Sequence, residues 1–151
     1  MPLLQSWGVR GVVVDLDNTI VPWHTSLLPE SIRAWASSLR AAAIGICLLT
    51  NNYSRSAQEV ATMLAVPVIH SALKPLPAGF RKSLTALSLP AAAVLVVGDQ
   101  LFTDVLGARL CGMRAVIVHP MSRRDFVTTK LLRLLERPLL ARLRREGVAN
   151  A

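Results

Sequence analysis

The stretch GVVVDLDNTIVPW, residues 11–23, determines how the rest of the chain is interpreted. It begins as a valine-rich run typical of a buried strand and then presents two carboxylates, Asp15 and Asp17, two positions apart. Side chains at that spacing on a strand point to the same side, and neighbouring carboxylates repel one another. Something elsewhere in the chain must therefore offset their repulsion.

Further short apolar runs rich in valine and isoleucine follow the first one. The five runs lie at 11–16, 44–50, 66–70, 93–99 and 114–120. They do not alternate with polar residues, as is typical of strands covered on both faces. Stretches with helical spacing separate them, near 29–41, 55–65, 77–88 and 103–111. This order predicts an α/β, Rossmann-like fold: a mostly parallel five-stranded sheet with helices on both faces. Ser54 is positioned to cap the second helix.

Charge is distributed unevenly over the 151 residues, whose formal net charge is +8. Residues 122–151 contain eight Arg or Lys and three acids. Of the six acids before them, four belong to two short motifs, Asp15, Asp17, Asp99 and Asp104. We therefore expect a core over residues 1–121 and a basic amphipathic helical tail over 122–151.

Several classes of protein are excluded by the composition. Although 52% of the residues are hydrophobic, no apolar run reaches the ~18 residues expected of a membrane-spanning helix. The first residues lack the pattern of a signal peptide, so we expect a cytoplasmic protein. Cys47 and Cys111 lie in apolar surroundings and are expected to be buried, reduced thiols, and no cysteine–histidine cluster suggests zinc.

Four polar signals fall where the predicted strands end, which is where open α/β sheets bind their ligands. The signals are DLDNT after the first strand, Thr50 with Asn51 and Asn52 after the second, Lys74 after the third, and GDQLFTD after the fourth. Each alone has an ordinary structural explanation as a turn, a helix cap or a surface lysine. Their joint occurrence at successive strand ends favours a single site.

The chemistry that needs this combination is phosphoryl transfer through a carboxylate. Several acids meeting at one point require a cation, and Mg²⁺ is the hard ion that prefers oxygen ligands. The cation and the surrounding donors would offset the repulsion between Asp15 and its neighbours.

The four motifs resemble those of the haloacid dehalogenase (HAD) superfamily of phosphatases. The resemblance is closer to the YqeG-type (HAD-IIIA) branch, covers nearly the whole chain, and is carried especially by VGDQLFTDVLGARLCGM at 97–113. This branch is similar to the mitochondrial phosphatidylglycerophosphate phosphatases.

The resemblance implies a role for each matching residue. Asp15 would be the nucleophile that forms an aspartyl-phosphate, and Asp17 would be the general acid and then the general base. Thr50, the backbone amide of Asn51, and Lys74 would bind the phosphate. The Mg²⁺ ligands would be Asp15, the backbone carbonyl of Asp17, Asp99, and Asp104, either directly or through water. Thr19 would orient the loop that carries Asp17.

The spacing of the motifs leaves no room for an inserted cap domain. Thirty residues lie between Thr19 and Thr50, and 23 lie between Thr50 and Lys74, so one helix with its connections fills each interval. An open site must exclude water by other means. This favours a phosphate on a macromolecule, a lipid or an oligomer.

The tail has two interpretations. Val127, Leu131, Leu134 and Leu135 recur at helical spacing, with Lys130, Arg133 and Arg137 on other faces. The helix could pack on the sheet with its basic side in solvent, or it could bind anionic lipid as an interfacial helix. The scarcity of aromatic residues argues against nucleic acid. As a partner for the basic side chains, an anionic membrane is therefore favoured over nucleic acid, and peripheral membrane contact through the tail is expected.

Three hypotheses follow from the sequence. The leading one is a capless, Mg²⁺-dependent phosphatase, and the resemblance to the phosphatidylglycerophosphate phosphatases implies that it converts phosphatidylglycerophosphate to phosphatidylglycerol. The second is a soluble phosphatase for a sugar, nucleotide or phosphoprotein, and the third is a non-catalytic binding protein on the same scaffold. His24 is expected to be a surface residue, and Trp23 is a candidate for the substrate mouth.

Overall fold

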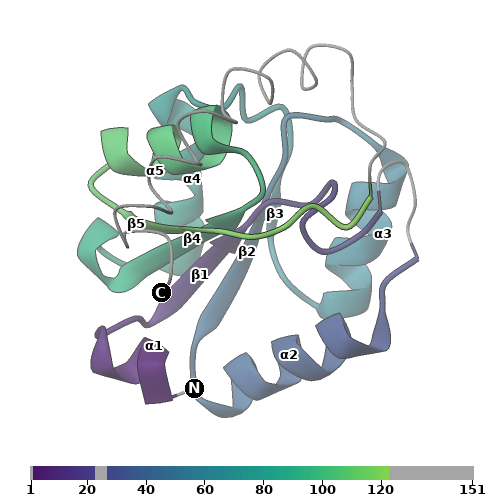
Figure 1. The fold of residues 1–151 in the computed structure, drawn as a ribbon, viewed down its shortest axis with the longest axis horizontal. Helices are drawn as coiled ribbons and strands as arrows, with labels where there is room; N and C mark the ends of the chain where they lie inside the picture. The colour runs from purple at the N-terminus through teal and green to yellow at the C-terminus, as the bar shows by residue number, and fades with distance from the viewer. Residues whose placement is uncertain (1, 23–26, 123–151) are drawn as a thin grey trace.

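The computed structural model describes residues 2–22 and 27–122. Its strands are β1 (Gly11–Val14), β2 (Gly45–Leu49), β3 (Val68–Ile69), β4 (Val94–Gly98) and β5 (Arg114–Ile117). Its α-helices are α1 (Pro2–Ser6), α2 (Glu30–Ala41), α3 (Arg55–Leu64), α4 (Pro77–Leu87) and α5 (Leu106–Leu110). A 3₁₀ turn at Ala91–Ala93 precedes β4, and a π-helical segment at Leu101–Val105 precedes α5. Figure 1 shows the arrangement of these elements.

The five strands form one parallel sheet in the order β3-β2-β1-β4-β5. β1 lies at its centre and pairs with β2 on one side and β4 on the other. The expected α/β, Rossmann-like fold is therefore confirmed. Because all strands run in the same direction, their carboxyl ends meet at one edge of the sheet.

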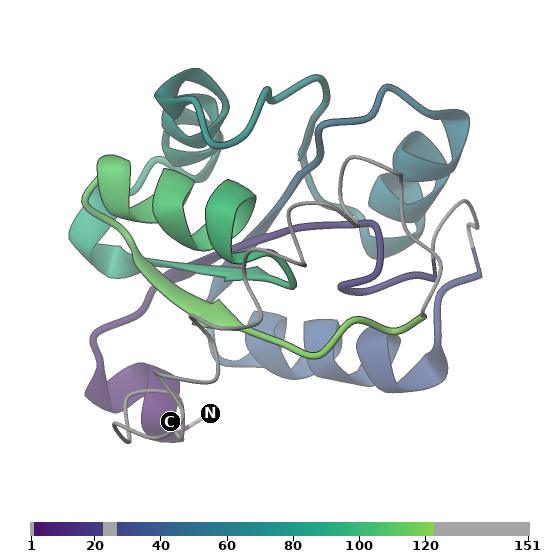
Figure 2. The ribbon, with the colours of Figure 1, turned by 45° about the horizontal axis from the view of Figure 1, so that its top comes forward.

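Alternate residues of the strands face two separate apolar cores. Val12 and Val14 belong to the core that includes residues of α2 and α3, whereas Val13 belongs to the core with Phe80 of α4 and Ala108 of α5. The two pairs of helices accordingly lie on opposite faces of the sheet, as Figures 1 and 2 show. Burial on both faces explains why β1 is an unbroken run of valines after Gly11.

Local signals set the helix boundaries. Ser54 caps α3 as expected, because its side chain accepts a hydrogen bond from the amide of Ala57 at 3.2 Å. α4 begins with Pro77, whose missing amide proton is not needed in the first turn. The helix that was expected over 103–111 instead starts as the π-helical segment and becomes α-helical only at Leu106. α1 was not predicted, because five residues are too few to show a helical period.

No separate cap domain interrupts the sheet within residues 2–22 and 27–122. In the described part of the chain, α2 lies in the interval between Thr19 and Thr50, and α3 and β3 lie in the interval between Thr50 and Lys74. Among the helices in these same ranges, none is long and apolar enough to cross a bilayer. The expected tail over 122–151, Trp23 and His24 lie outside the described residues, apart from Ser122.

The two cysteines differ in environment. Cys47 is buried in β2, whereas Cys111 is partly exposed after α5, and both are free thiols. The expectation of two buried thiols is therefore wrong for Cys111. Burial raises the pKa of the Cys47 thiol to about 11, against the opposing effect of a hydrogen bond with Ser83.

We predict that iodoacetamide at pH 8 will alkylate Cys111 in the native protein and leave Cys47 unmodified, because a buried thiol with a raised pKa supplies little thiolate. Mass spectrometry of tryptic peptides measures both sites, and Cys111→Ser provides a protein whose native modification should be absent. Between pH 9 and 11 the folded state keeps the Cys47 proton and the unfolded state loses it. The contribution of this thiol to the free energy of unfolding should therefore fall as the pH rises through that interval. Rapid native alkylation of Cys47 would contradict the predicted burial.

Candidate active site

A group of polar side chains is buried at the carboxyl edge of the sheet. Asp15 follows β1, Thr50 follows β2, and Asp99 follows β4. Lys74 and Asp104 come from the segment after β3 and from the π-helical segment after β4. All five are buried, with exposed fractions of 7% or less. The carboxyl ends of the parallel strands thus bring together residues from all four motifs identified in the sequence.

Lys74 is the centre of the group. Its Nζ donates to Asp15 Oδ1 and to Asp104 Oδ1, both at 2.6 Å. Burial opposes the charge of the ammonium and would lower its pKa, but the carboxylates of Asp104 and Asp15 outweigh burial and raise the pKa above its usual range. The ammonium is therefore a permanent positive charge between two carboxylates. It offsets part of the repulsion between neighbouring carboxylates that was expected from the sequence.

Asp15 is held through both of its carboxylate oxygens. Oδ1 accepts from Lys74, and Oδ2 accepts from the hydroxyl of Thr19 at 2.9 Å. The backbone amide of Asp15 donates to the carbonyl of Val97 in β4 at 2.9 Å. The hydroxyl of Thr19 thus bonds to Asp15, whereas the sequence led us to expect a role in orienting the loop of Asp17. Asp15 is accordingly oriented by neighbours from three parts of the chain.

Asp104 lies against the backbone of β4. Its Oδ2 accepts from the amide of Gln100 at 3.1 Å. A Cβ at Gly98 would lie 2.3 Å from Asp104 Cγ, so only glycine leaves room for this carboxylate. Burial raises the pKa of Asp104 to about 6, with Lys74 opposing the shift and Asp15 reinforcing it.

Three of these carboxylates could hold a metal ion together. Asp15, Asp99 and Asp104 each offer an oxygen, and these oxygens lie within 4.8 Å of one another. Three carboxylates against the single ammonium of Lys74 leave two net negative charges in a buried site. Oxygen ligands and excess negative charge suit a divalent cation. The residues present therefore fit such an ion.

Asp17 lies farther out than Asp15 and is half-buried. Asn52 Nδ2 donates to Asp17 Oδ2 at 2.7 Å, and the amide of Asn52 donates to the hydroxyl of Thr50 at 3.1 Å. The chain turns directly after Asp17, where Asn18 adopts a left-handed conformation (φ 65°), which asparagine tolerates better than most residues. Asp17 is thus supported by the loop after β2.

Asn51 connects the loop after β2 to the segment that carries Lys74. Its Oδ1 accepts from the backbone amide of Lys74 at 2.7 Å, and its Nδ2 donates to the backbone carbonyl of Lys74 at 3.3 Å. These two hydrogen bonds together fix the backbone from which the lysine side chain extends.

The side chains of Asn51 and Asn52 are the contribution that sequence reasoning missed. Asn51 was expected to act through its backbone amide, and Asn52 had no expected role. The consecutive asparagines after β2 were the available signal, because a carboxamide can donate and accept at once.

The sequence is similar to that of known hydrolases. Residues 21–112 match the family model of the haloacid dehalogenase-like hydrolases. The chain is 31% identical over 144 residues to the probable phosphatase YqeG of Bacillus subtilis. The matched region covers 95% of this chain and 84% of that relative. It is 29% identical over 128 residues to the chloroplastic phosphatidylglycerophosphate phosphatase 1 of Chlamydomonas reinhardtii, covering 79% of this chain and 48% of that protein.

A solved structure shares the fold. The cobalt-bound deoxy-D-mannose-octulosonate 8-phosphate phosphatase of Haemophilus influenzae superposes with a TM-score of 0.62 at 16% identity, over 76% of this chain and 72% of that chain. At this identity the likeness concerns the arrangement of the sheet and helices.

We predict that Lys74→Met will lower the free energy of unfolding by roughly 3–5 kcal/mol at pH 7 in the presence of a chelator, because Asp15 and Asp104 would stay buried without their cation. Chemical denaturation followed by circular dichroism measures the change.

Lys82→Met removes a lysine from the exposed side of α4 and should change the same quantity by less than about 0.5 kcal/mol. Adding Asp104→Asn to Lys74→Met should recover part of the loss, since one uncompensated charge is then removed. Equal effects of Lys74→Met and Lys82→Met would show that the buried ion pairs contribute no stability.

Proposed function

This chain belongs to the haloacid dehalogenase-like hydrolases and is a phosphatase of that family, and from this premise we propose that it hydrolyses phosphatidylglycerophosphate to phosphatidylglycerol with Mg²⁺ as cofactor. The observation that carries the chemistry is the buried carboxylate group of Asp15, Asp99 and Asp104, in which Asp15 and Asp104 pair with the ammonium of Lys74. The lipid substrate is supported by the likeness to the algal phosphatidylglycerophosphate phosphatase.

Asp15 is the proposed nucleophile. The donors on its two oxygens, Lys74 and Thr19, fix the direction of the carboxylate. A carboxylate oxygen attacks the phosphorus, a new phosphorus–oxygen bond forms, and the bond to the glycerol oxygen breaks. The phosphoryl group is then carried by Asp15 as an aspartyl-phosphate.

Asp17 is the proposed general acid and base. In its protonated form it gives its proton to the departing glycerol oxygen. Its carboxylate then takes a proton from water, whose oxygen attacks the phosphorus of the aspartyl-phosphate. This second step releases inorganic phosphate and restores Asp15. The bond from Asn52 to Asp17 supports the role, because it holds the outer carboxylate in one orientation.

Phosphate binding is assigned to Thr50, the backbone amide of Asn51, and Lys74. Their hydroxyl, amide and ammonium groups are donors suited to the charge that develops on phosphoryl oxygens. Asp15, Asp99 and Asp104 would hold the cation, with Asp17 contributing its backbone carbonyl. When bound, Mg²⁺ would neutralise charge on the carboxylates and on the phosphate.

The absence of a cap from the described ranges supports a substrate presented at a surface, because nothing there encloses a small metabolite. The basic tail supports an anionic surface, since each Lys or Arg near such a membrane contributes about 1 kcal/mol. We therefore place the proposed reaction at the inner face of the membrane, with the protein in peripheral contact from the cytoplasm.

The test is phosphate release from phosphatidylglycerophosphate in vesicles by the full chain. We expect release with Mg²⁺, loss of release with a chelator, and a decrease of at least ~10³-fold for Asp15→Asn, which removes the nucleophile. Malachite-green assay of inorganic phosphate measures all three. A soluble phosphoester should be hydrolysed more slowly than the lipid.

Two outcomes would separate the parts of the proposal. Efficient hydrolysis of a sugar phosphate, a nucleotide or a phosphopeptide without release from the lipid would replace the substrate while keeping the chemistry. Equal rates for the wild type and Asp15→Asn on every ester would overturn the assignment of the nucleophile.

We predict that Asn52→Ala will lower kcat by about 10-fold and change KM by less than ~2-fold, because it releases Asp17 without removing a phosphate donor. Gln58→Ala, which removes an exposed carboxamide from α3, should leave both constants near wild type. Steady-state kinetics on the best ester measure the two variants. A rise in KM with unchanged kcat would assign Asn52 to substrate binding instead.

A further inference from the structure

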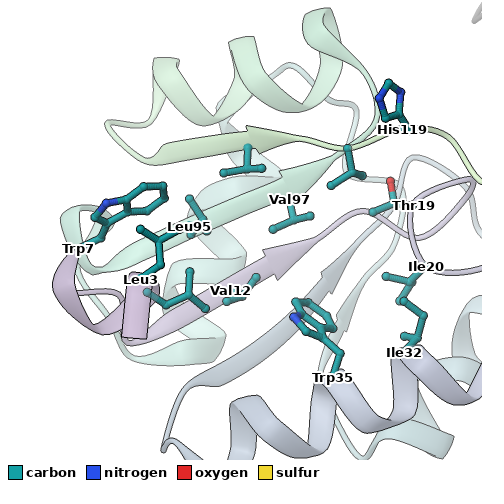
Figure 3. A pocket seen from close by; sticks show the side chains of 13 residues that line it. Leu3, Trp7, Val12, Thr19, Ile20, Ile32, Trp35, Leu95, Val97 and His119 are labelled. Carbon is teal, nitrogen blue, oxygen red and sulfur yellow. The ribbon is translucent and has the colours of Figure 1, made fainter. Parts of the chain in front are cut away.

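An apolar groove of about 400 Å³ crosses the face of the sheet that carries α2. Figure 3 shows side chains of α1, β1, α2 and β4 directed into this space. Trp7 and Leu3 line one end, Trp35 lines the α2 side, and the sheet contributes Leu95, Val97 and Val116 to the floor. Thr19 and His119 supply polar atoms at the end nearest the active site. The groove is thus an apolar surface with one polar end.

The topology explains why the groove exists. On this face α2 packs over β2 and α3 over β3, so these helices cover the β1–β2–β3 half of the sheet. On the opposite face α5 packs against β5. Parallel strands normally have cover on both faces. Of the helices within residues 2–22 and 27–122, only the short α1 reaches the β4–β5 half of the first face, and it does so at one end (Figure 2).

The described chain ends beside the mouth of this groove. Val118 and His119, which follow β5, line it. Met121 and Ser122 are then tied to the loop after β1, because the amide of Met121 donates to the carbonyl of Asn18 at 2.8 Å and Ser122 Oγ donates to Asn18 Oδ1 at 2.6 Å. The described chain therefore ends at the catalytic edge, and the groove leads back from that edge toward α1.

The length and pattern of the following sequence suit the groove. Twenty-nine residues, 123–151, follow Ser122. Within them Val127, Leu131 and Leu134 share one face at helical spacing, and about 12 residues of helix span ~18 Å. A strand of five or six residues is about as long, at ~3.3 Å per residue. One helix can thus cover the strands from end to end.

We propose that the segment 126–137 packs as a helix in this groove, with its valine and leucine stripe against Val97, Val116 and Trp35. The lining within the described residues contains no acid, lysine or arginine, so it matches the apolar stripe and excludes the basic face. The occupant is this chain's own tail, and neither a lipid chain nor a second copy is needed to cover the sheet. Lys130, Arg133 and Arg137 would then lie outside the apolar stripe, along one side of the helix.

The experiment is methyl NMR on the full chain with labelled leucine and valine. We expect nuclear Overhauser contacts from Leu131 and Leu134 to Val97 and Val116 at low protein concentration and without lipid. Leu134→Asp should abolish these contacts, shift the groove methyl signals and lower Tm. Thr129→Asp adds the same charge on the other side of the predicted helix and should preserve the contacts.

Absence of the contacts in the wild type would overturn the proposal. Groove signals that respond instead to dioctanoyl phosphatidic acid would assign the groove to acyl chains. Signals that change only with protein concentration, together with a dimer in analytical ultracentrifugation, would assign it to a second copy. None of these outcomes depends on phosphatase activity, so the proposed function is tested separately.

Discussion

The buried ammonium of Lys74 between Asp15 and Asp104 is the interaction on which the site depends. Removing these three charges from water is costly, and their mutual attraction repays the cost only when the geometry is close. Both contacts measure 2.6 Å, and they join three segments that are 59 and 30 residues apart in sequence. The ammonium allows the carboxylates to gather, and the two negative charges that remain in the group suit a divalent cation.

The parallel sheet supplies the position of this interaction. β1 lies between β2 and β4, so the residues that follow all three strands emerge side by side. Valines on both faces of β1 fix the strand within two cores. A shift of one residue would turn every side chain of the strand, and Asp15 after it, to the opposite face of the sheet. The direction of the Asp15 side chain is therefore a consequence of how the preceding valines of β1 pack in the two cores. The register of β1 in the sheet therefore determines both the burial of its valines and the position of Asp15 at the carboxyl edge.

The sequence predicted much of this because its signals were local and repeated. Five valine- and isoleucine-rich runs, of which the first four are followed by polar motifs, predicted the strands, and Ser54 marked the start of α3. The parts that escaped prediction depend on distances across the fold. Thr19 bonds to Asp15, Asn51 to the Lys74 backbone, and Asn52 to Asp17, and no pattern of spacing specifies such partners. The π-helical segment escaped too, because its period is not visible in five residues.

The carboxamide of Asn51 has a consequence for how this architecture tolerates change. β3 contains only two residues, so it is a short anchor for the segment that carries Lys74. The Asn51 side chain hydrogen-bonds both the amide and the carbonyl of Lys74. Because Asn51 lies in the loop after β2, these bonds fix the position of Lys74 relative to this longer strand. Within the intervening stretch from His70 to Leu73, the amide of Ala72 donates to the carbonyl of Thr50 at 3.0 Å, so the loop after β2 holds this stretch at a second point. An insertion between Ile69 and Lys74 would therefore have to preserve both attachments to the loop after β2 for the ammonium to keep its acidic partners.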